Sequence, residues 1–366
     1  MRFGFLSECE TPKGTTHHRR YWEVVDEVIL AEEMGFDFFG TSEQHFTVGI
    51  ATVSAPESFY PALAMRTSRI RLRSMIVLLP FPFNHPIRVA EQLATLDIMS
   101  NGRAELGTGR ANTLLELDGF QCPLDETRPR WEEALEIIMK AFKDDPFSHD
   151  GKYFQIPPRS LTPRGVQQPH PPVFMVTQSP ESHEVAARKG IGALSWDMYL
   201  GWDYFEEGFR IYKKGIESAD PVGAFVTNSF GLASLDVVCA ESRSEALKSG
   251  QAGISRFATT VIKHLYPALG KRSDSYAYTL QLEKIQDKAG DLDYLSHDPC
   301  VLVGDPDHFV ERIRRYQEMG VDEVIMRFDG NHETIKRSIE LIGKYVIPTF
   351  KTPNSVIGDS PLAGVP

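Results

Sequence analysis

The stretch Ile76–Arg110, IVLLPFPFNHPIRVAEQLATLDIMSNGRAELGTGR, decides the fold of this 366-residue chain. The apolar run that leads into it, Met75–Leu79, predicts a buried strand, and the prolines that follow force an irregular loop. A helix comes next and stops at the Ser-Asn-Gly turn of residues 100–102. A second short strand then ends in Gly107, Gly109 and Arg110. A cation at the end of a strand is informative because a parallel barrel carries its chemistry at that end.

The order helix, glycine, strand occurs three times along the chain. It is AEEMGFDFFGTSE at residues 31–43, YQEMGVDEVIMRF at residues 316–328 and, in a looser form, AARKGIGALSW at residues 186–196. Each copy ends a helix at a glycine, which can take the left-handed cap conformation. Alternating helices and strands predict a parallel sheet. About eight such strands favour a closed barrel over an open doubly wound sheet, and the GxGxxG motif that opens the latter is absent after the first strand.

We therefore expect an α/β protein with one (β/α)8 TIM-barrel domain over residues 1–350. The polar segment 251–299 does not follow the period, and we expect it to be an insertion before the last βα unit that lies over the barrel mouth as a lid. Residues 157–172 are predicted to be a surface connection and residues 351–366 a poorly ordered tail. The predicted strands are 2–6, 36–41, 70–79, 103–108, 173–177, 193–196, 225–239 and 323–328, and the predicted helices are 21–34, 56–67, 86–99, 131–142, 181–189, 204–216, 309–319 and 334–346.

Composition limits the classes of partner. The formal net charge is −11, so we expect no nucleic-acid partner, because phosphate binding needs a basic face. No window reaches the about 18 apolar residues of a membrane span, and the amino terminus turns polar too early for a secretory signal, which predicts a cytoplasmic protein without membrane contact.

Cys9, Cys122, Cys239 and Cys300 form no CxxC pair and are predicted to be buried, reduced thiols. Ligand spacing typical of a metal site is absent, so no metal is expected.

Four segments give the chain a family resemblance that covers residues 1–349. They are Glu43–Phe46 (EQHF), Leu79–Arg103, Gly107–Arg110 (GTGR) and the Pro171-Pro172 strand that runs through residues 179–182 to Ser195-Trp196. In these segments the chain resembles the bacterial-luciferase-like flavin-dependent oxidoreductases. The resemblance implies a barrel, usually a homodimer, that binds reduced FMN or a related deazaflavin at its mouth. The common reaction is monooxygenation, in which reduced flavin and O2 form a C4a-(hydro)peroxyflavin that oxidises a small organic substrate, often with a separate reductase supplying the flavin.

The resemblance also assigns the residues expected to bind the cofactor. Arg110 matches an arginine that binds the flavin phosphate, which a guanidinium can clamp bidentately; a surface ion pair is the alternative. Ser179 and Ser182 match phosphate ligands at a helix N-terminus, where ordinary N-capping would use the same donors, and Gln178 beside them replaces an acidic residue of luciferase. Met75 and Ile76 match two residues that are joined by a cis peptide bond beside the flavin ring. The alternative is that they simply belong to a core strand. Trp196 either packs near the ring or belongs to the core.

The expected catalytic residues are Glu43, Gln44 and His45, which follow the second predicted strand. Histidine titrates near neutral pH and suits proton transfer to the flavin or substrate, although a hydrogen-bonded structural histidine is an equal alternative. Gln44 stands where luciferase has its catalytic histidine. An amide cannot act as a base at pH 7, so the resemblance predicts a substrate other than the aldehyde of luciferase.

Two other functions stay open at this point: a deazaflavin-dependent dehydrogenase or reductase that transfers hydride, and a non-catalytic flavin-binding protein. The segments EQHF and LPFPFNHP resemble the FMN-dependent branch more closely, which favours the monooxygenase.

Substrate choice is expected to depend on the mouth loops at residues 8–20, 46–54, 112–128 and 251–299. Their aromatic residues suggest an apolar or aromatic substrate: Phe46, Phe59, Phe120, Tyr276 and Tyr278.

Overall fold

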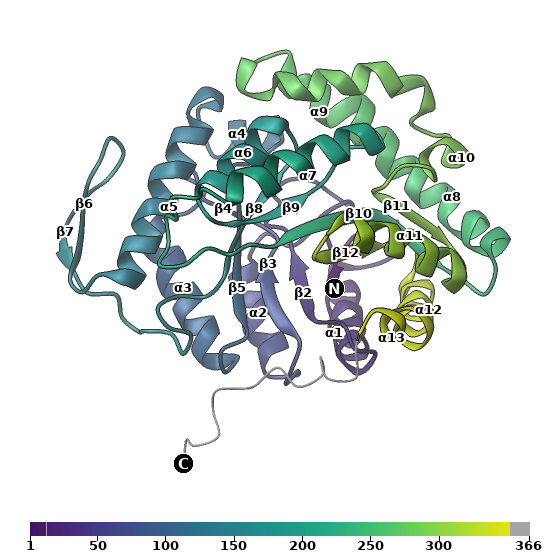
Figure 1. The fold of residues 1–366 in the computed structure, drawn as a ribbon, viewed down its shortest axis with the longest axis horizontal. Helices are drawn as coiled ribbons and strands as arrows, with labels where there is room; N and C mark the ends of the chain where they lie inside the picture. Colours follow the sequence, from purple (N-terminus) through teal and green to yellow (C-terminus); the bar gives the residue numbers. More distant parts are fainter. Residues whose placement is uncertain (12, 352–366) are drawn as a thin grey trace.

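Eight parallel strands close into a barrel at the centre of the computed structural model, which describes residues 1–11 and 13–351 (Figure 1). The last strand pairs with both the first strand and the seventh, and this pairing closes the ring. The (β/α)8 TIM barrel predicted from the sequence is therefore confirmed. The strands, in order around the barrel, are β1 (Arg2–Leu6), β2 (Phe38–Thr41), β3 (Arg71–Ser74) with its continuation β4 (Val77–Leu78), β5 (Ala104–Gly109), β8 (Val173–Thr177), β9 (Gly192–Ser195), β10 (Phe230–Cys239) and β12 (Glu323–Phe328).

Helices between successive strands cover the outside of the barrel (Figure 1). Helix α3 begins where the sequence predicts because Pro86 fits its first turn and the His85 side chain accepts a hydrogen bond from the Ile87 N–H. Helix α11 ends at Gly320, whose φ of +92° favours glycine. The helices are α1 (His17–Glu33), α2 (Pro56–Ala64), α3 (Pro86–Met99), α4 (Leu114–Gly119), α5 (Thr127–Lys143), α6 (Pro180–Arg188), α7 (Trp202–Ile216), α8 (Arg243–Thr259), α11 (Pro306–Met319), α12 (His332–Leu341) and α13 (Ile347–Phe350).

Three features of the strands differ from the sequence prediction. The strand predicted at 70–79 is split into β3 and β4 around the cis peptide bond Met75–Ile76. Part of the predicted surface connection belongs to an antiparallel hairpin, β6 (Phe147–Asp150) and β7 (Gln155–Arg159), which projects from the barrel (Figure 1). Strand β11 (Val301–Gly304) was not predicted; it extends the sheet by pairing with the second half of β10, beyond a register shift between Ser234 and Val237.

The segment between β10 and β11 is helical throughout much of its length. Its first part, through Thr259, is the barrel helix α8 rather than an insertion. The remainder forms a π-helix (Thr260–Leu265), α9 (Tyr266–Gly270), a 3-10 segment (Asp274–Lys288) and α10 (Leu292–Leu295). Side chains from this remainder contact residues at the carboxyl ends of β5 and β8, as described below, so it covers part of the barrel mouth.

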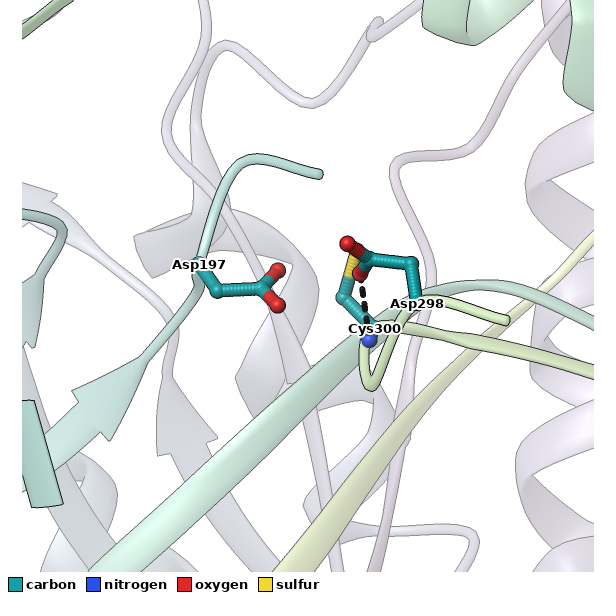
Figure 2. Close-up of side chains that lie close together, drawn as sticks. All are labelled: Asp197, Asp298 and Cys300. Atoms are coloured by element: carbon teal, nitrogen blue, oxygen red, sulfur yellow. Dashed lines mark hydrogen bonds between the residues drawn. The ribbon is translucent and has the colours of Figure 1, made fainter. Parts of the chain in front are cut away.

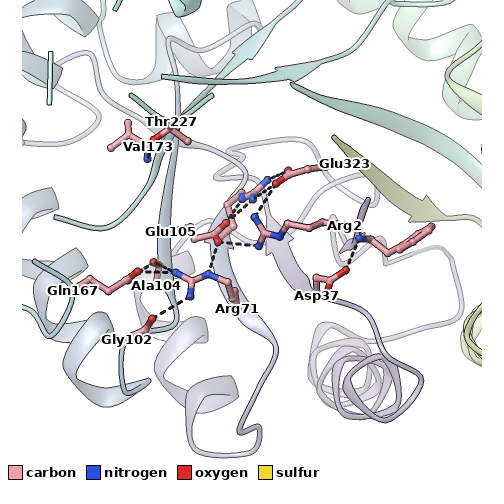
Figure 3. A network of polar contacts seen from close by, with 12 residues as sticks. Arg2, Asp37, Arg71, Gly102, Ala104, Glu105, Gln167, Val173, Thr227 and Glu323 are labelled. Atoms are coloured by element: carbon pink, nitrogen blue, oxygen red, sulfur yellow. Dashed lines mark hydrogen bonds and ion pairs between the residues drawn. The ribbon is translucent and has the colours of Figure 1, made fainter. Parts of the chain in front are cut away.

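A layer of buried ion pairs fills the opposite, amino-terminal end of the barrel (Figure 3). Arg73 is fully buried and donates to Glu105 (2.6 Å) and Glu323 (2.5 and 3.0 Å). Arg2 donates to the same two carboxylates at 2.9 and 2.8 Å, and Arg71 also pairs with Glu105. Burial would raise the pKa of Glu105, but the three neighbouring arginines outweigh it and lower that pKa. These pairs join β1, β3, β5 and β12 below the site.

Three further expectations concern the cysteines, membrane spans and the C-terminal tail. All four cysteines are buried and free, as predicted. Within residues 1–11 and 13–351, none of the helices has the length and apolar character needed to cross a bilayer. The tail predicted from residue 351 lies, from residue 352 onward, outside the described residues.

Candidate active site at the barrel mouth

A cavity of about 130 Å³ lies on the barrel axis at the carboxyl ends of the strands. Every barrel strand, or the residues just after it, contributes to its wall, and α8 and the following helices cover it with Phe257, Val261, Leu265 and Tyr266. The wall is mainly apolar, as expected for a site that holds an organic ring. The strand-end residues are Leu6, Glu8, Ser42, Gln44, Met75, Ile76, Asn112, Thr113, Val176, Gln178, Leu194, Trp196, Ala233, Leu235 and Ile325.

A second cavity of about 40 Å³ adjoins the first and shares Ile76, Asn112, Val176 and Gln178 with it. Its wall contains three residues that the sequence analysis assigned to the flavin phosphate: Arg110, Ser179 and Ser182. The fold thus brings together, around one cavity, side chains from the ends of β5 and β8. We refer to this second cavity as the anion subsite.

The N-terminus of α6 forms one wall of the anion subsite. Ser179 is the N-cap, and its side chain accepts a hydrogen bond from the Ser182 N–H in a capping box. The Ser182 hydroxyl in turn accepts from the N–H groups of Gln178 (3.0 Å) and Ser179 (2.9 Å). Ser179 and Ser182 therefore make the ordinary N-capping contacts that the sequence analysis gave as the alternative to phosphate binding. Since the same N–H groups and the positive end of the helix dipole attract anions, a phosphate could take the place of the Ser182 oxygen as their acceptor.

Arg110 is held by the segment that covers the mouth. Its guanidinium donates to the Ser275 hydroxyl (2.6 Å) and carbonyl (2.9 Å), and it lies 4.4 Å from the ring centroid of Tyr276. Its described partners are thus a hydroxyl, a carbonyl and an aromatic ring, so the expected alternative of a surface ion pair is not what the structure shows. All three partners are neutral, and they leave the positive charge of Arg110 uncompensated beside the α6 N-terminus.

Arg128, which the sequence analysis missed, does not line the anion subsite but lies beside it, against Glu181 in the first turn of α6. Both terminal nitrogens of its guanidinium are inaccessible to solvent and lack a hydrogen-bond partner among the described residues. One of them lies 3.3 Å from a carboxylate oxygen of Glu181 without hydrogen-bond geometry. Burial, followed by the positive charge of Arg110, lowers the pKa of Arg128. Two nearby arginines and a helix N-terminus fit a dianionic phosphate, which would satisfy the orphaned donors of Arg128. No local motif in the sequence marks this arginine.

The residues expected beside the flavin ring line the larger cavity. Met75 and Ile76 form part of its wall and are joined by a cis peptide bond. Trp196 lies on the same wall, and its indole N–H is buried without a hydrogen-bond partner among the described residues. An isoalloxazine ring carries carbonyl and ring-nitrogen acceptors that such a donor could serve. Together with the anion subsite, this donor set fits FMN.

Of the three expected catalytic residues, only Gln44 lines the cavity. Glu43 and His45 point the other way, because successive side chains of an extended chain alternate between its two sides. Glu43 accepts from the Leu78 N–H (2.8 Å) and from the Asn84 amide, and His45 lies 3.1 Å from Glu43 with its ring 4.6 Å from the ring of Phe120. The structure therefore places Glu43 and His45 outside the wall of this cavity, and their catalytic role stays a prediction.

The expected aromatic residues of the mouth divide in a similar way. Tyr276 and Tyr278 line the anion subsite, and Phe46 is 57% exposed. Phe59 was wrongly placed at the mouth; it lies on the buried face of α2, with its ring 5.4 Å from that of Tyr21 on α1. The aromatic residues that contact the larger cavity are instead Trp196, Phe257 and Tyr266.

A buried cluster of Asp197, Asp298 and Cys300 lies beside β9 and β11 (Figure 2). One potential ligand atom from each residue falls within 4.8 Å of the others, a spacing that could hold a metal ion. Asp298 accepts from the N–H groups of Gly201 and Cys300, both at 2.9 Å. Burial, and then the charge of Asp298, raises the pKa of Asp197, which favours two carboxyl groups sharing a proton. The sequence analysis expected no metal and missed this cluster, because its members lie far apart along the chain.

Comparison with known proteins agrees with this geometry. The profile of the family described as Luciferase-like monooxygenase matches residues 1–323. The oxygenase component of the flavin-dependent trigonelline monooxygenase of Acinetobacter baylyi is 30% identical over 215 residues, 57% of each chain. The chain spans about half the length of the first curated relatives it matches, from 46% to 57%.

Solved structures match over a larger share of the chain. The monooxygenase RslO1 of Streptomyces bottropensis superposes with a TM-score of 0.77 at 25% identity, covering 96% of this chain and 100% of that one. The oxygenating constituent of 3,6-diketocamphane monooxygenase of Pseudomonas putida, solved with FMN, has a TM-score of 0.75 at 21% identity and covers 96% and 99%. Enzymes that depend on F420 share the fold as well, with TM-scores of 0.68 and 0.70.

Proposed function

Because this chain belongs to the luciferase-like monooxygenase family, we propose that it is a monooxygenase that uses reduced FMN and O2 to oxidise a small organic substrate. The observation that supports the proposal is the anion subsite, a small cavity lined by Arg110 and the N-terminus of α6. Arg128 lies beside that N-terminus, 3.3 Å from Glu181, with unpartnered guanidinium nitrogens. This donor set suits the phosphate of FMN. The adjoining larger cavity offers the apolar wall and the free indole N–H that a flavin ring requires.

Bound reduced flavin would supply the electrons that activate O2, and the protein would supply the environment. Arg110, Arg128 and the α6 N–H groups would hold the phosphate, while Met75, Ile76 and Trp196 would orient the ring. The helices after β10 would exclude water, which prevents side reactions such as hydrolysis of reactive intermediates. Gln44 can donate and accept hydrogen bonds at the cavity wall but cannot act as a base.

We further propose that a separate reductase provides the reduced flavin and that the protein is a homodimer. The first proposal is supported by the relative from Acinetobacter baylyi, which is named as the oxygenase component of its system. The second follows from the family resemblance. The runner-up function is hydride transfer with the deazaflavin F420, supported by the F420-dependent enzymes that share the fold.

The test is an anaerobic titration of the purified protein with reduced FMN, reduced riboflavin and reduced F420, followed by exposure to air. We expect tighter binding of FMN than of riboflavin, and an oxygen-dependent flavin signal. Arg110→Ala should weaken FMN binding by about 10- to 100-fold, as expected for loss of a charge-assisted contact of roughly 1.5–3 kcal/mol. Riboflavin, which lacks the phosphate, should bind this variant as it binds the wild type.

The matched control is Arg130→Ala, which removes the same charge from an arginine that pairs with Glu126 outside the anion subsite. Its FMN affinity should stay close to that of the wild type. Equal losses for FMN and riboflavin in Arg110→Ala would disprove the phosphate assignment. A preference for F420 without any reaction with O2 would replace the monooxygenase with the hydride-transfer enzyme, and flavin binding without turnover of any substrate would indicate a non-catalytic flavin-binding protein.

A further inference from the structure

Glu8 supplies the only carboxyl group among the described residues that line the larger cavity. It follows β1 and shares its inward direction with Leu6, two residues earlier, as the alternation of an extended chain requires. The side chain is partly exposed, whereas its Oε2 atom is inaccessible and has no hydrogen-bond partner among the described residues. A carboxyl oxygen without a partner in an apolar site is costly to bury. Its presence therefore indicates that something outside the described chain satisfies it.

The hydrogen bonds around Ser42 define the missing partner. The Ser42 hydroxyl lies 2.8 Å from Glu8 Oε1 and 2.5 Å from the Met75 carbonyl. A hydroxyl has one proton, and the Met75 carbonyl can only accept, so Ser42 donates to Met75. The contact with Glu8 is then best made by a neutral carboxyl group that donates from Oε1 to the Ser42 oxygen. This leaves Oε2 as a carbonyl-type oxygen, which needs a donor.

The surroundings of Glu8 agree with a neutral carboxyl group near neutral pH. Burial raises the pKa of Glu8 to about 7, the contact with the Ser42 hydroxyl opposes this increase, and Glu10 adds to it. Arg327 on β12 lowers the pKa and Glu116 on α4 raises it, both to a smaller extent. A neutral acceptor favours a neutral donor such as a hydroxyl group over a cation.

The position of Glu8 in the barrel separates it from the anion subsite. Going around the ring from β1 to β8, one passes β2, β3 and β5 on one side and β12, β10 and β9 on the other. Glu8 follows β1, whereas Gln178 and Ser179 follow β8, so the carboxyl group and the α6 N-terminus are on opposite walls of the mouth. A cofactor anchored by its phosphate at β8 would extend from that wall into the adjoining larger cavity, which would leave the β1 wall for the substrate.

We propose that Glu8 is the substrate-recognising residue of this site, and that the substrate is a small, largely apolar molecule with a hydroxyl group that donates to the Glu8 carboxyl. This inference rests on the proposed function, because it assumes that the cavity also holds a flavin. The hydroxyl would lie against the β1 wall and complete the hydrogen bonds of Glu8. The rest of the molecule would contact the apolar residues contributed by β1, β10 and β12: Leu6, Ala233, Leu235 and Ile325.

The test uses two matched probe pairs, p-cresol with 4-methylanisole and cyclohexanol with cyclohexyl methyl ether. Each pair differs mainly in the hydroxyl proton. Affinities are measured by calorimetry on the full-length protein, both without flavin and with FMN bound. We expect the wild type to bind each hydroxyl probe at least about tenfold more tightly than its ether, since a site built for a donor rejects the analogue that lacks it.

Variants at Glu8 identify the residue responsible. Glu8→Leu removes the acceptor and should abolish the preference. Glu8→Gln imitates the neutral carboxyl group, because its amide N–H can donate to Ser42 and its carbonyl stays free, so it should retain the preference and lose any dependence on pH near 7. The matched control is Glu10→Gln, two residues further along, which pairs with Arg327 outside the cavity wall and should leave the preference unchanged. Circular dichroism establishes that each variant is folded.

The two hypotheses fail in different ways. Equal affinity for hydroxyl and ether probes in the wild type, absence of binding by both hydroxyl probes up to their solubility, or an undiminished preference in folded Glu8→Leu would each overturn the role of Glu8. Failure of the protein to bind FMN would refute the proposed function instead. The probe preference is also measured without flavin, so it is decided independently.

Discussion

Replacing Glu323 by glutamine tests how much the buried ion pairs contribute to the barrel. Glu323 is fully buried on β12, and its two oxygens receive hydrogen bonds from Arg73 and Arg2. Glu323→Gln keeps the shape of the side chain but removes one of the two negative charges that face Arg2, Arg71 and Arg73. The arginines are then left with Glu105 alone, and Arg73, with no exposed surface, cannot recover its lost partner from water.

The expected loss can be estimated from the burial of the pair. Breaking a buried ion pair by removing one partner destabilises a protein by about 3–5 kcal/mol. For a chain of 366 residues, an unfolding entropy of roughly 2.1 cal/mol/K per residue gives roughly 0.8 kcal/mol/K in total. The melting temperature should therefore fall by roughly 4–7 °C. Differential scanning calorimetry gives the midpoint, and urea unfolding gives the corresponding change in free energy.

The control is Glu241→Gln, which removes a charge from a pair with Arg337 in which both side chains are about half exposed. Exposed pairs contribute roughly 0–1 kcal/mol, so its melting temperature should change by less than about 2 °C. A double variant, Arg73→Met with Glu323→Met, removes one charge of each sign and should be less destabilised than the sum of its two single variants. Equal shifts for Glu323→Gln and Glu241→Gln, or strict additivity in the double variant, would refute the reasoning.

Two further predictions follow from the described contacts. Burial would raise the pKa of Glu105 and of Glu323, but the neighbouring arginines outweigh this effect and hold both pKa values below 4.5. The free energy of unfolding should therefore be at its full value above about pH 4.5 and decrease as the pH falls below it. Urea titrations across pH should show a shallower decrease for Glu323→Gln than for the wild type. His45→Asn should change FMN affinity and the rate of flavin reoxidation by no more than about twofold, because the ring faces Phe120 rather than the cavity; a tenfold slower reoxidation at unchanged affinity would return His45 to a role in proton transfer.

The parts of the fold that depend on local signals could be predicted from the sequence. The bounds of α3, β8 and β12 agree with the predicted ranges, because proline, glycine and the turn at residues 100–102 mark them directly. The barrel itself follows from the repeated helix–glycine–strand unit. By contrast, β11 pairs with the end of β10 beyond a register shift, and the hairpin β6–β7 lies outside the barrel period. Neither feature has a counterpart in the repeated unit.

The site residues show a different limit of sequence reasoning. Arg110, Ser179 and Ser182, which the family resemblance assigns to the flavin phosphate, line one cavity. Arg110 directly follows β5, and the two serines lie at the N-terminus of α6, just after β8. Glu43 and His45 also follow a strand, yet they face outward. Successive side chains alternate between the two sides of a strand, so the residues that face the axis depend on which side is turned inward. The aromatic residues of β2 reveal that side: Phe38 contacts Arg73 inside the barrel, whereas Phe39 contacts Phe5 in the layer under the helices. Residues 42 and 44 are in phase with Phe38, and this phase could not be read from the sequence alone.

The same phase argument connects the buried ion pairs, the cofactor and the substrate. On β1, Leu6 and Glu8 face the axis, and on β12 Ile325 does, above the arginine–glutamate layer that joins β1, β3, β5 and β12. That layer connects β1 and β12, two of the three strands whose upper ends form the proposed substrate wall, whereas the proposed phosphate anchor depends on β5, β8 and α6. A substitution at Glu8 should therefore change substrate recognition without disturbing the phosphate anchor. A substitution at Arg110 should weaken cofactor binding without changing the substrate wall. Because β1 and β8 are opposite each other in the ring, the closure of the barrel would keep the proposed recognition of substrate and of cofactor on separate walls.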